Sequence, residues 1–420
     1  MPAWLPILTR DEAQRAVAAR GFDRPPTVPV PAGQVGIELE WLAVDAREPT
    51  RPAASATVDA VTRSLALPGG SRLTFEPGGQ VELSSPPLPL ACACDVAATD
   101  ARVLGDALAA SGVALVALGL EPGPRRERAV HNPRYDAMEA YFDHANGAGR
   151  TMMRSTAALQ VNIDLGDEAD VERRWRAAHD VGPVLAASFA NSPIGDDGPT
   201  GYRSTRLAVW AAIDPSRTAP AERNGDCRAA WAEYALAAPV MLVRTSAERH
   251  VPVLRELPFD EWIERGHDLG WPTLDDLAYH LTTLFPPVRP RGWLELRMLD
   301  AVPDPWWRVA VAVSAVLVQD PQLVERVRPA VQPTVDRWID AARAGLTDPG
   351  FATAARACFE VALDALPGRG VDAATVAATE CYLEQYVAEG RCPADDRLDA
   401  WRRGESALPP ADNAIEAAWT

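Results

Sequence analysis

The alternation of apolar and polar residues predicts an α+β protein built on an antiparallel sheet. Four segments show the two-residue period of a strand: residues 35–44, 72–84, 157–165 and 292–299. Helical patterns lie between them at 91–111, 172–188 and 274–284, and from Pro305 onward the chain turns to long alanine-rich helical segments. Strands with one apolar face are typical of an antiparallel sheet that packs helices on one side.

We expect three parts along the chain. Residues 1–33 would contain a short amphipathic helix at 9–19 and the proline-rich lead-in GFDRPPTVPVPAG. Residues 34–304 carry the four strands and would form the core that holds the functional site. Residues 305–420 would form a helical region packed on that core, with a loosely held end from residue 404.

Composition restricts the classes of function. The 420-residue chain has a net charge of −17, and all 41 basic residues are arginine because the sequence contains no lysine. This excludes a P-loop lysine and a Schiff-base lysine, so any phosphate chemistry must depend on arginine, backbone amides or metal ions. The acidic balance argues against nucleic-acid and anionic-membrane binding, which both need a basic surface.

Cysteine usage and the N-terminus favour a cytoplasmic protein. The six cysteines are scattered and lack the paired spacing of zinc ligands, as expected of reduced thiols. No apolar run approaches the roughly 20 residues of a membrane helix. The apolar segment at the N-terminus is too short for a signal peptide. We therefore expect a cytoplasmic protein that has no membrane partner.

Carboxylates share one face of the first strand. In VGIELEWLA, Glu38 and Glu40 point to one side, and the apolar residues at 35, 37, 39 and 41 point to the other. The other strands place further polar side chains on the corresponding face: Glu76 and Glu82 in the second segment, Gln160, Asn162 and Asp164 in the third, and Glu295 and Arg297 in the fourth.

Repulsion among these carboxylates indicates a cation. Same-face carboxylates on one strand lie roughly 7 Å apart, and at an effective dielectric constant of about 20 they repel by about 2 kcal/mol. Oxygen ligands from Glu, Gln and Asn favour Mg²⁺ or Mn²⁺ over zinc or copper, and Mg²⁺ held by carboxylates commonly bridges substrate phosphates. This pattern favours nucleotide chemistry, and the alternative is a sheet whose polar face lies in water.

Arginines complete the candidate site, because their planar forks suit carboxylate and phosphate groups. Arg297 shares a strand face with Glu295 and would lie where a transferring phosphoryl group develops charge. Arg289 and Arg291 precede that strand, and they could equally be surface charges. The candidate arginines are Arg203, Arg206, Arg217, Arg289, Arg291 and Arg297.

Five segments in collinear order resemble the glutamate-cysteine ligases of the plant and actinobacterial type, the GCS2 family. They are GIELEWL, FEPGGQVELSSPP, TAALQVNID, RLAVWAAIDPSRT and FPPVRPRGWLELRMLDAVP, spanning about residues 35–307. The last segment is most similar to the branch that makes gamma-glutamylcysteine for ergothioneine synthesis. The resemblance implies a glutamine-synthetase-like catalytic fold, with the sheet curved into a bowl, the active site on its concave face and helices on its convex face.

The resemblance also implies an activity. ATP would phosphorylate the gamma-carboxylate of L-glutamate, and the amine of L-cysteine would then displace phosphate to give gamma-glutamylcysteine, ADP and phosphate. Mg²⁺, or Mn²⁺ in its place, would neutralise the phosphates, and ATP would be the co-substrate. The implied partners are these small molecules, and the implied state is a monomer or a weak homo-oligomer.

The matching motifs imply a role for individual residues. Arg297 and Glu295 would be catalytic, with Arg291 and Arg289 joining Arg297 at ATP. The implied metal ligands are Glu38, Glu40, Glu76, Glu82 and Glu295. The implied substrate contacts are Arg206 at the glutamate carboxylate, Gln160 and Asn162 in the glutamate or metal pocket, Trp210, and Arg217 as either a substrate contact or a loop-structure residue.

One departure bears on the amine substrate. The plant relatives carry a tryptophan-threonine-aspartate run where this chain has VWAAIDP, which retains Trp210 but alters its neighbours. The alternatives are therefore a carboxylate-amine ligase of the same fold with a different amine, or a catalytically silent metabolite-binding homologue. Outside this fold, a magnesium-dependent phosphohydrolase would also fit an acidic site without lysine.

Overall fold

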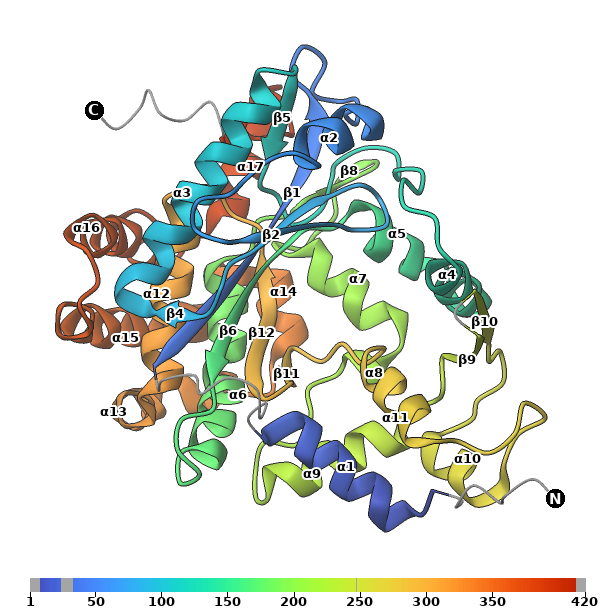
Figure 1. Ribbon diagram of the computed structural model, residues 1–420. Coiled ribbons are helices and arrows are strands. Elements are labelled where there is room, and N and C mark those ends of the chain that lie inside the picture. The colour runs from blue at the N-terminus through green and yellow to red at the C-terminus, as the bar shows by residue number, and fades with distance from the viewer. Residues whose placement is uncertain (1–7, 24–32, 247, 413–420) are drawn as a thin grey trace.

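The computed structural model describes residues 8–23, 33–246 and 248–412 and is centred on an antiparallel sheet (Figure 1). The strand order is β11-β12-β6-β1-β3-β2, and β4 and β5 pair with the two ends of β1. All these pairs are antiparallel, which confirms the predicted α+β class with an antiparallel sheet. The strands are β1 (Gln34–Asp45), β2 (Arg72–Phe75), β3 (Val81–Ser84), β4 (Leu88–Pro89), β5 (Val113–Val116), β6 (Ala158–Asp164), β11 (Val288–Pro290) and β12 (Trp293–Asp300).

The register brings the polar faces of the strands together. Glu40 of β1 lies opposite Glu82 of β3, and Glu38 lies opposite Gln160 of β6. On the other side of β6, Asn162 lies opposite Glu295 of β12. Side chains that lie directly opposite on neighbouring strands share a face, so the predicted polar faces merge into one surface.

Helices bury the apolar face of the sheet. Contacts join α3 (Leu90–Ala109) to β1 and β5, α6 (Val171–Ser188) to β12, and α12 (Trp306–Gln319) to β6. Ile37 and Val161 on this face are fully buried. Every residue of α12 except Arg308 is buried, as expected for a helix that is apolar all round.

Helices α13, α15 and α16 of the C-terminal region lie on the same side of the sheet as α3, whereas α14 packs against α6 and α7 (Figure 1). Buried residues of this region and of the strands belong to one continuous hydrophobic core. The division at residue 304 into two parts stays a prediction. These helices are α13 (Pro321–Val331), α14 (Trp338–Ala344), α15 (Pro349–Ala365), α16 (Ala373–Tyr382) and α17 (Pro393–Arg402).

The other side of the sheet faces α4, α5, α7 and α8, which lie to its right in Figure 1. Below them α1 packs on α9, with α10 and α11 nearby, and the β9–β10 hairpin packs on α4 (Figure 1). The remaining elements are α1 (Arg10–Phe22), α2 (Ser55–Thr62), α4 (Pro133–Ala145), α5 (Ala148–Ser155), β7 (Ile194–Gly195), β8 (Gly198–Pro199), α7 (Thr205–Ile213), α8 (Pro215–Thr218), α9 (Cys227–Ala237), β9 (Leu242–Ser246), β10 (Arg249–Pro252), α10 (Phe259–Arg265) and α11 (Leu274–Leu281).

The strand-like segment at 72–84 is a hairpin of β2 and β3, and its turn lies at the Pro-Gly-Gly sequence of residues 77–79. The turn between β2 and β3 needs its glycines, because Gly79 has φ +82° and a Cβ at Gly78 would lie 2.0 Å from the carbonyl oxygen of Arg154. The proline-rich lead-in lies mostly outside the described residues. The end of the chain is not loose as far as residue 412, since the Asp412 carboxylate accepts from Trp41 Nε1 (2.8 Å) and from the Asp304 backbone N–H (3.1 Å).

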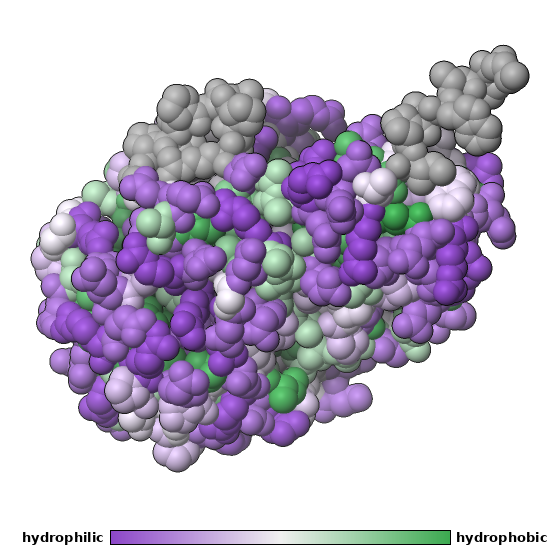
Figure 2. All heavy atoms as spheres, turned by 90° about the horizontal axis from the view of Figure 1, so that it is seen from below, coloured by the Kyte–Doolittle hydropathy of each residue, from purple (hydrophilic) through white to green (hydrophobic). Residues whose placement is uncertain are grey.

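The face seen from below is dominated by hydrophilic side chains, with small separate apolar areas (Figure 2). Over the part of the chain that the structure covers, no helix is both long and apolar enough to cross a lipid bilayer.

Replacing Asp300 should lower the free energy of unfolding by about 3–5 kcal/mol, the usual cost of removing one partner from a buried charged network. Asp300 is 1% exposed, and its carboxylate accepts from Asn191 N (2.8 Å), Ser192 Oγ (2.7 Å) and Ser204 Oγ (2.9 Å). Urea denaturation of Asp300→Ala measures the loss. The control is Asp268→Ala at an exposed position, which should change stability by less than about 0.5 kcal/mol. Equal stabilities would contradict the anchoring role of Asp300.

Candidate active site

A cavity of about 670 Å³ lies on the polar face of the sheet. Its floor consists of residues on β1, β2, β3, β6 and β12, and its walls come from α4, α5 and α7. The predicted residues that line it are Glu38, Glu40, Glu76, Glu82, Gln160, Arg206, Trp210, Arg289, Arg291, Glu295 and Arg297. One cavity therefore gathers most of the residues that the sequence singled out.

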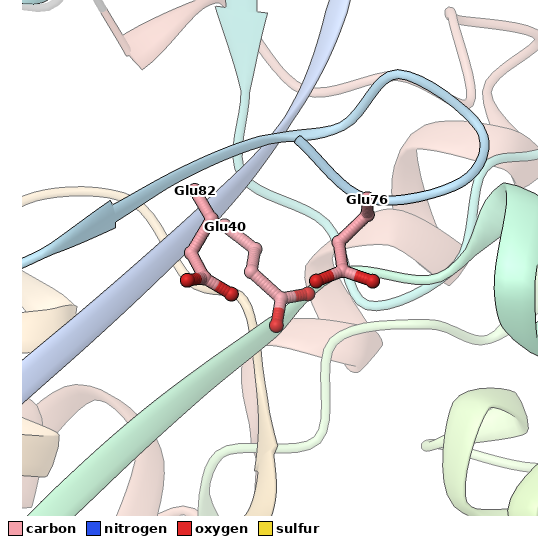
Figure 3. A group of neighbouring side chains, drawn as sticks. All are labelled: Glu40, Glu76 and Glu82. Atoms are coloured by element: carbon pink, nitrogen blue, oxygen red, sulfur yellow. The ribbon is translucent and has the colours of Figure 1, made fainter. Parts of the chain in front are cut away.

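Three carboxylates converge in this cavity, and we call Glu40, Glu76 and Glu82 the acidic trio (Figure 3). One oxygen from each lies within 4.8 Å of the others. Glu40 and Glu82 project from paired strands. Glu76 lies in the turn after β2, and its backbone N–H donates to the carbonyl oxygen of Gln80 (3.0 Å), which closes the turn. Among the described residues, the acidic trio is the group of acidic, histidine or cysteine side chains whose ligand atoms lie close enough together to hold a metal ion.

Electrostatics show that the acidic trio is short of positive charge. Burial raises the pKa of Glu76 to about 7, and Glu82 adds to the shift. Burial likewise raises the pKa of Glu40 well above its usual value, with Glu76 and Glu82 contributing. Glu38 has a pKa raised to about 7 by burial and by Glu295 and Glu82. A divalent cation would supply the missing charge, so the donor set fits Mg²⁺ or Mn²⁺.

Two amide side chains connect the carboxylates to the rest of the site. Gln160 Nε2 donates to Glu40 Oε1 (3.0 Å), and Gln160 Oε1 accepts from Arg297 Nη1 (2.5 Å). Asn162 Nδ2 donates to Glu38 Oε1 (2.9 Å), but Asn162 is not among the residues that line the cavity. Asn162 is thus placed to orient Glu38, and Gln160 joins the acidic trio to an arginine.

Three arginines surround Glu295, which is fully buried. Its carboxylate accepts from Arg289 Nε (2.5 Å) and Nη2 (3.1 Å), Arg291 Nη1 (3.3 Å) and Arg297 Nη1 (3.2 Å). Burial opposes ionisation of Glu295, yet Arg289 and Arg297 hold its pKa well below the usual range. We call these four residues the arginine cluster. It has more cations than anions, which suits phosphate groups.

The arginine cluster revises two expectations from the sequence. Glu295 engages arginines and lies outside the acidic trio, so its role as a metal ligand stays a prediction. Arg289 is only 8% exposed, which contradicts the alternative of a surface charge, whereas the side chain of Arg291 is 48% exposed.

Helix α7 contributes Arg206 and Trp210. Arg206 is 2% exposed, and its Nη2 donates to the carbonyl oxygen of Arg297 (2.9 Å). Arg206 Nη1 lies 3.7 Å from Asp300 Oδ1 and, like Trp210 Nε1, is buried without a hydrogen-bond partner among the described residues. The Trp210 ring lies 5.9 Å from the Arg206 guanidinium carbon and 5.6 Å from that of Arg297. A buried guanidinium that lines the cavity is suited to an anionic group such as a carboxylate.

Two other predicted arginines lie elsewhere. Arg217 is fully buried and donates to Asp214 Oδ2 (2.7 Å), the carbonyl oxygen of Thr283 (3.0 Å) and the carbonyl oxygen of Pro239 (2.6 Å). It does not line the cavity, so the structure favours its loop-structure alternative over substrate contact. Arg203 pairs with Asp395 (2.8 Å) and is also absent from the cavity.

Sequence reasoning missed the wall formed by α4 and α5. Arg134, Tyr135 and Met138 of α4 and Met152 and Met153 of α5 line the cavity. Burial and the nearby Glu76 raise the pKa of Tyr135 to about 12. The Asn-Pro pair that begins α4 marks a helix start in the sequence. Nothing in its spacing indicates which strand face the helix covers.

A cavity with clustered carboxylates on one side and clustered arginines on the other offers the kinds of side chain that metal-dependent phosphoryl transfer uses. The chain belongs to the glutamate-cysteine ligase family 2, whose model matches residues 34–411. This finding confirms the resemblance drawn from the five sequence segments.

Individual relatives agree with this assignment. The chain is 43% identical over 379 residues to the glutamate–cysteine ligase EgtA of Mycolicibacterium smegmatis, covering 88% of this chain and 87% of that protein. It is 40% identical over 378 residues to EgtA of Mycobacterium tuberculosis, covering 88% and 86%. The chloroplastic glutamate–cysteine ligase of Brassica juncea is 31% identical over 256 residues, covering 59% and 49%.

Solved structures support the fold alone. A glutamate–cysteine ligase from Francisella tularensis in complex with AMP aligns with a TM-score of 0.55 at 11% identity, over 90% of this chain and 86% of that one. A bifunctional glutathione synthetase from Pasteurella multocida aligns with a TM-score of 0.52 at 16% identity, over 94% and 52%.

Mg²⁺ should stabilise the protein more at higher pH. Between the usual carboxylate pKa of 4.5 and the raised values of about 7 for Glu38 and Glu76, the folded state binds more protons than the unfolded one. The metal-free protein therefore loses stability as pH rises through this window. A cation binds the deprotonated carboxylates, so the increase in Tm from chelator to Mg²⁺ should grow from about pH 5 to about pH 8.

The Glu40→Gln variant is the comparison for this measurement. It removes one carboxylate from the acidic trio and should reduce the Mg²⁺-dependent increase in Tm at every pH. A pH-independent increase, equal in both proteins, would place the stabilising ion elsewhere.

Proposed function

We propose that this protein is an ATP-dependent glutamate–cysteine ligase that joins the gamma-carboxylate of L-glutamate to the amine of L-cysteine. The observation that carries the proposal is the meeting of the acidic trio and the arginine cluster in one cavity, on a chain that is 43% identical to a protein named for this activity. A site for a carboxylate substrate and a metal-bound phosphate donor needs both kinds of charge.

Each half of the cavity has its own role in this proposal. Glu40, Glu76 and Glu82, with Glu38 beside them, hold Mg²⁺ or Mn²⁺, which neutralises phosphate oxygens when bound. Glu295 holds the arginines and is a further metal ligand. Arg289, Arg291 and Arg297 contact phosphate oxygens of ATP. Arg206 binds a carboxylate of L-glutamate, with Gln160 and Trp210 beside it.

The reaction has two steps. A gamma-carboxylate oxygen of glutamate attacks the gamma-phosphorus of ATP, the bond from phosphorus to the bridging oxygen breaks, and ADP leaves. The amine nitrogen of cysteine then attacks the acyl carbon, the carbon–oxygen bond to phosphate breaks, and the nitrogen loses a proton. Arg297 stabilises the charge that develops on the transferring phosphoryl group.

The cellular setting follows from the same proposal. Gamma-glutamylcysteine would supply ergothioneine or another low-molecular-weight thiol. The protein would act in the cytoplasm as a monomer or weak homo-oligomer, and its sheet would be curved into a bowl with the site on the concave face.

ADP release with Mg-ATP and L-glutamate across a panel of amines tests the activity, with the product identified by mass. We expect L-cysteine to give the highest kcat/KM. A wide margin for another amine would make the protein a different ligase of the same fold. No ADP release with any amine would leave the silent binding protein as the better description.

Arg297→Lys should lower kcat by about 100-fold, because lysine cannot keep the planar contacts to phosphate, Gln160 and Glu295. The KM for L-glutamate should change much less, since the contact strengthens in the transition state. Steady-state kinetics of this variant and of Arg343→Lys, an exposed position on α14, give the comparison. Near-normal turnover of Arg297→Lys would argue against a phosphate contact.

A further inference from the structure

Asp300 lies behind the guanidinium of Arg206. It is the last residue of β12, three positions after Arg297. Its Oδ1 lies 3.7 Å from Arg206 Nη1, and its side chain is fully buried. Arg206 lines the candidate active site, whereas Asp300 does not. Asp300 can therefore act on a ligand in the cavity only through Arg206.

Two serines connect Asp300 to the start of α7. Ser204 Oγ donates to Asp300 Oδ1 (2.9 Å) and accepts from the Leu207 backbone N–H (3.2 Å), which caps the helix. Ser192 Oγ donates to Asp300 Oδ2 (2.7 Å) and accepts from the Arg206 backbone N–H (3.2 Å). One carboxylate thus holds both the first turn of α7 and the arginine that this turn carries.

The Asp300 carboxylate has little room to move. The Asn191 backbone N–H donates to its Oδ2 (2.8 Å), and Asn191 Nδ2 donates to the carbonyl oxygen of Ala301 (2.8 Å). The backbone of Gly119 approaches so closely that a Cβ there would lie 2.4 Å from Asp300 Cγ. A binding residue supported in this way is held in one orientation.

Asp300 also balances the charge of Arg206. Burial lowers the pKa of Arg206, and the carboxylate of Asp300 opposes this shift. Glu40 of the acidic trio attracts the same guanidinium from the cavity side. Removal of Asp300 would therefore let Arg206 turn towards the proposed metal ligands.

Building on the proposed function, we propose that Asp300 is a positioning residue that aims Arg206 at the carboxylate of L-glutamate that does not react. The reacting gamma-carboxylate belongs beside Arg297, where the phosphoryl group is transferred. The alpha-carboxylate is then the group left for Arg206. Asp300 touches no reacting atom, and its effect passes through the orientation of Arg206.

A substrate without the alpha-carboxylate separates positioning from general support of the fold. Gamma-aminobutyrate keeps the amine and the reacting carboxylate of L-glutamate but has no alpha-carboxylate. The ratio of kcat/KM for L-glutamate to kcat/KM for gamma-aminobutyrate therefore reports the contact at Arg206. Asp300→Asn keeps the shape and removes the charge, and it should lower this ratio at least about 10-fold. Calorimetry without ATP should show a Kd for L-glutamate raised by a similar factor.

Ser192→Ala is a milder change in the same network. It removes one hydroxyl between Asp300 and Arg206 and should lower the ratio about 3-fold. This variant carries the test if Asp300→Asn does not fold. The KM for ATP should stay within about 2-fold in both variants.

Asp395→Asn is the matched control. Asp395 is 6% exposed and pairs with Arg203 (2.8 Å), but neither residue lines the cavity. This variant should lose stability and keep the wild-type ratio. An equal loss of kcat/KM for both substrates in Asp300→Asn and Ser192→Ala would overturn the positioning role while leaving the ligase function intact. A wild-type protein that ligates L-glutamate to no amine would overturn both.

Discussion

Repulsion among carboxylates on one face of the sheet is the constraint on which the site depends. Glu40 and Glu82 lie directly opposite on paired strands, a placement that is unfavourable for like charges. Burial, together with this repulsion, raises the pKa values of Glu38, Glu40 and Glu76. The fold tolerates it because β1 lies between β3 and β6 in the sheet and its other face is packed against helices.

The cavity separates its charges. The acidic trio lies on the β1, β2 and β3 side, and the arginine cluster lies on β11, β12 and the turn between them. Gln160 of β6 connects the two, because its amide nitrogen donates to Glu40 and its oxygen accepts from Arg297. A metal-bound phosphate has the complementary arrangement, with positive charge at the ion and negative charge at the oxygens.

The C-terminal helices are part of the structural argument for the site. The buried α12 supports β6 from behind, and Asp412 ties the end of the described chain to Trp41 of β1. On the other side α14 packs on α7 and lines a cavity of about 190 Å³ that also includes Arg206 and Arg297. The C-terminal helices supply few ionisable residues to the site, but they support its floor and line an adjoining cavity.

The sequence by itself determined the antiparallel class, the strand segments and the face on which Glu38, Glu40, Glu82, Gln160 and Arg297 lie, because the two-residue period of a strand is local. Only the tertiary structure decided which side chains meet. Register and the β2–β3 turn brought Glu76 into the acidic trio. Glu295 pairs with three arginines, and buried Arg217 donates to loop carbonyls. The walls from α4, α5 and α14 come from residues distant in the chain. Such contacts depend on packing between elements, which periodicity within one segment does not encode.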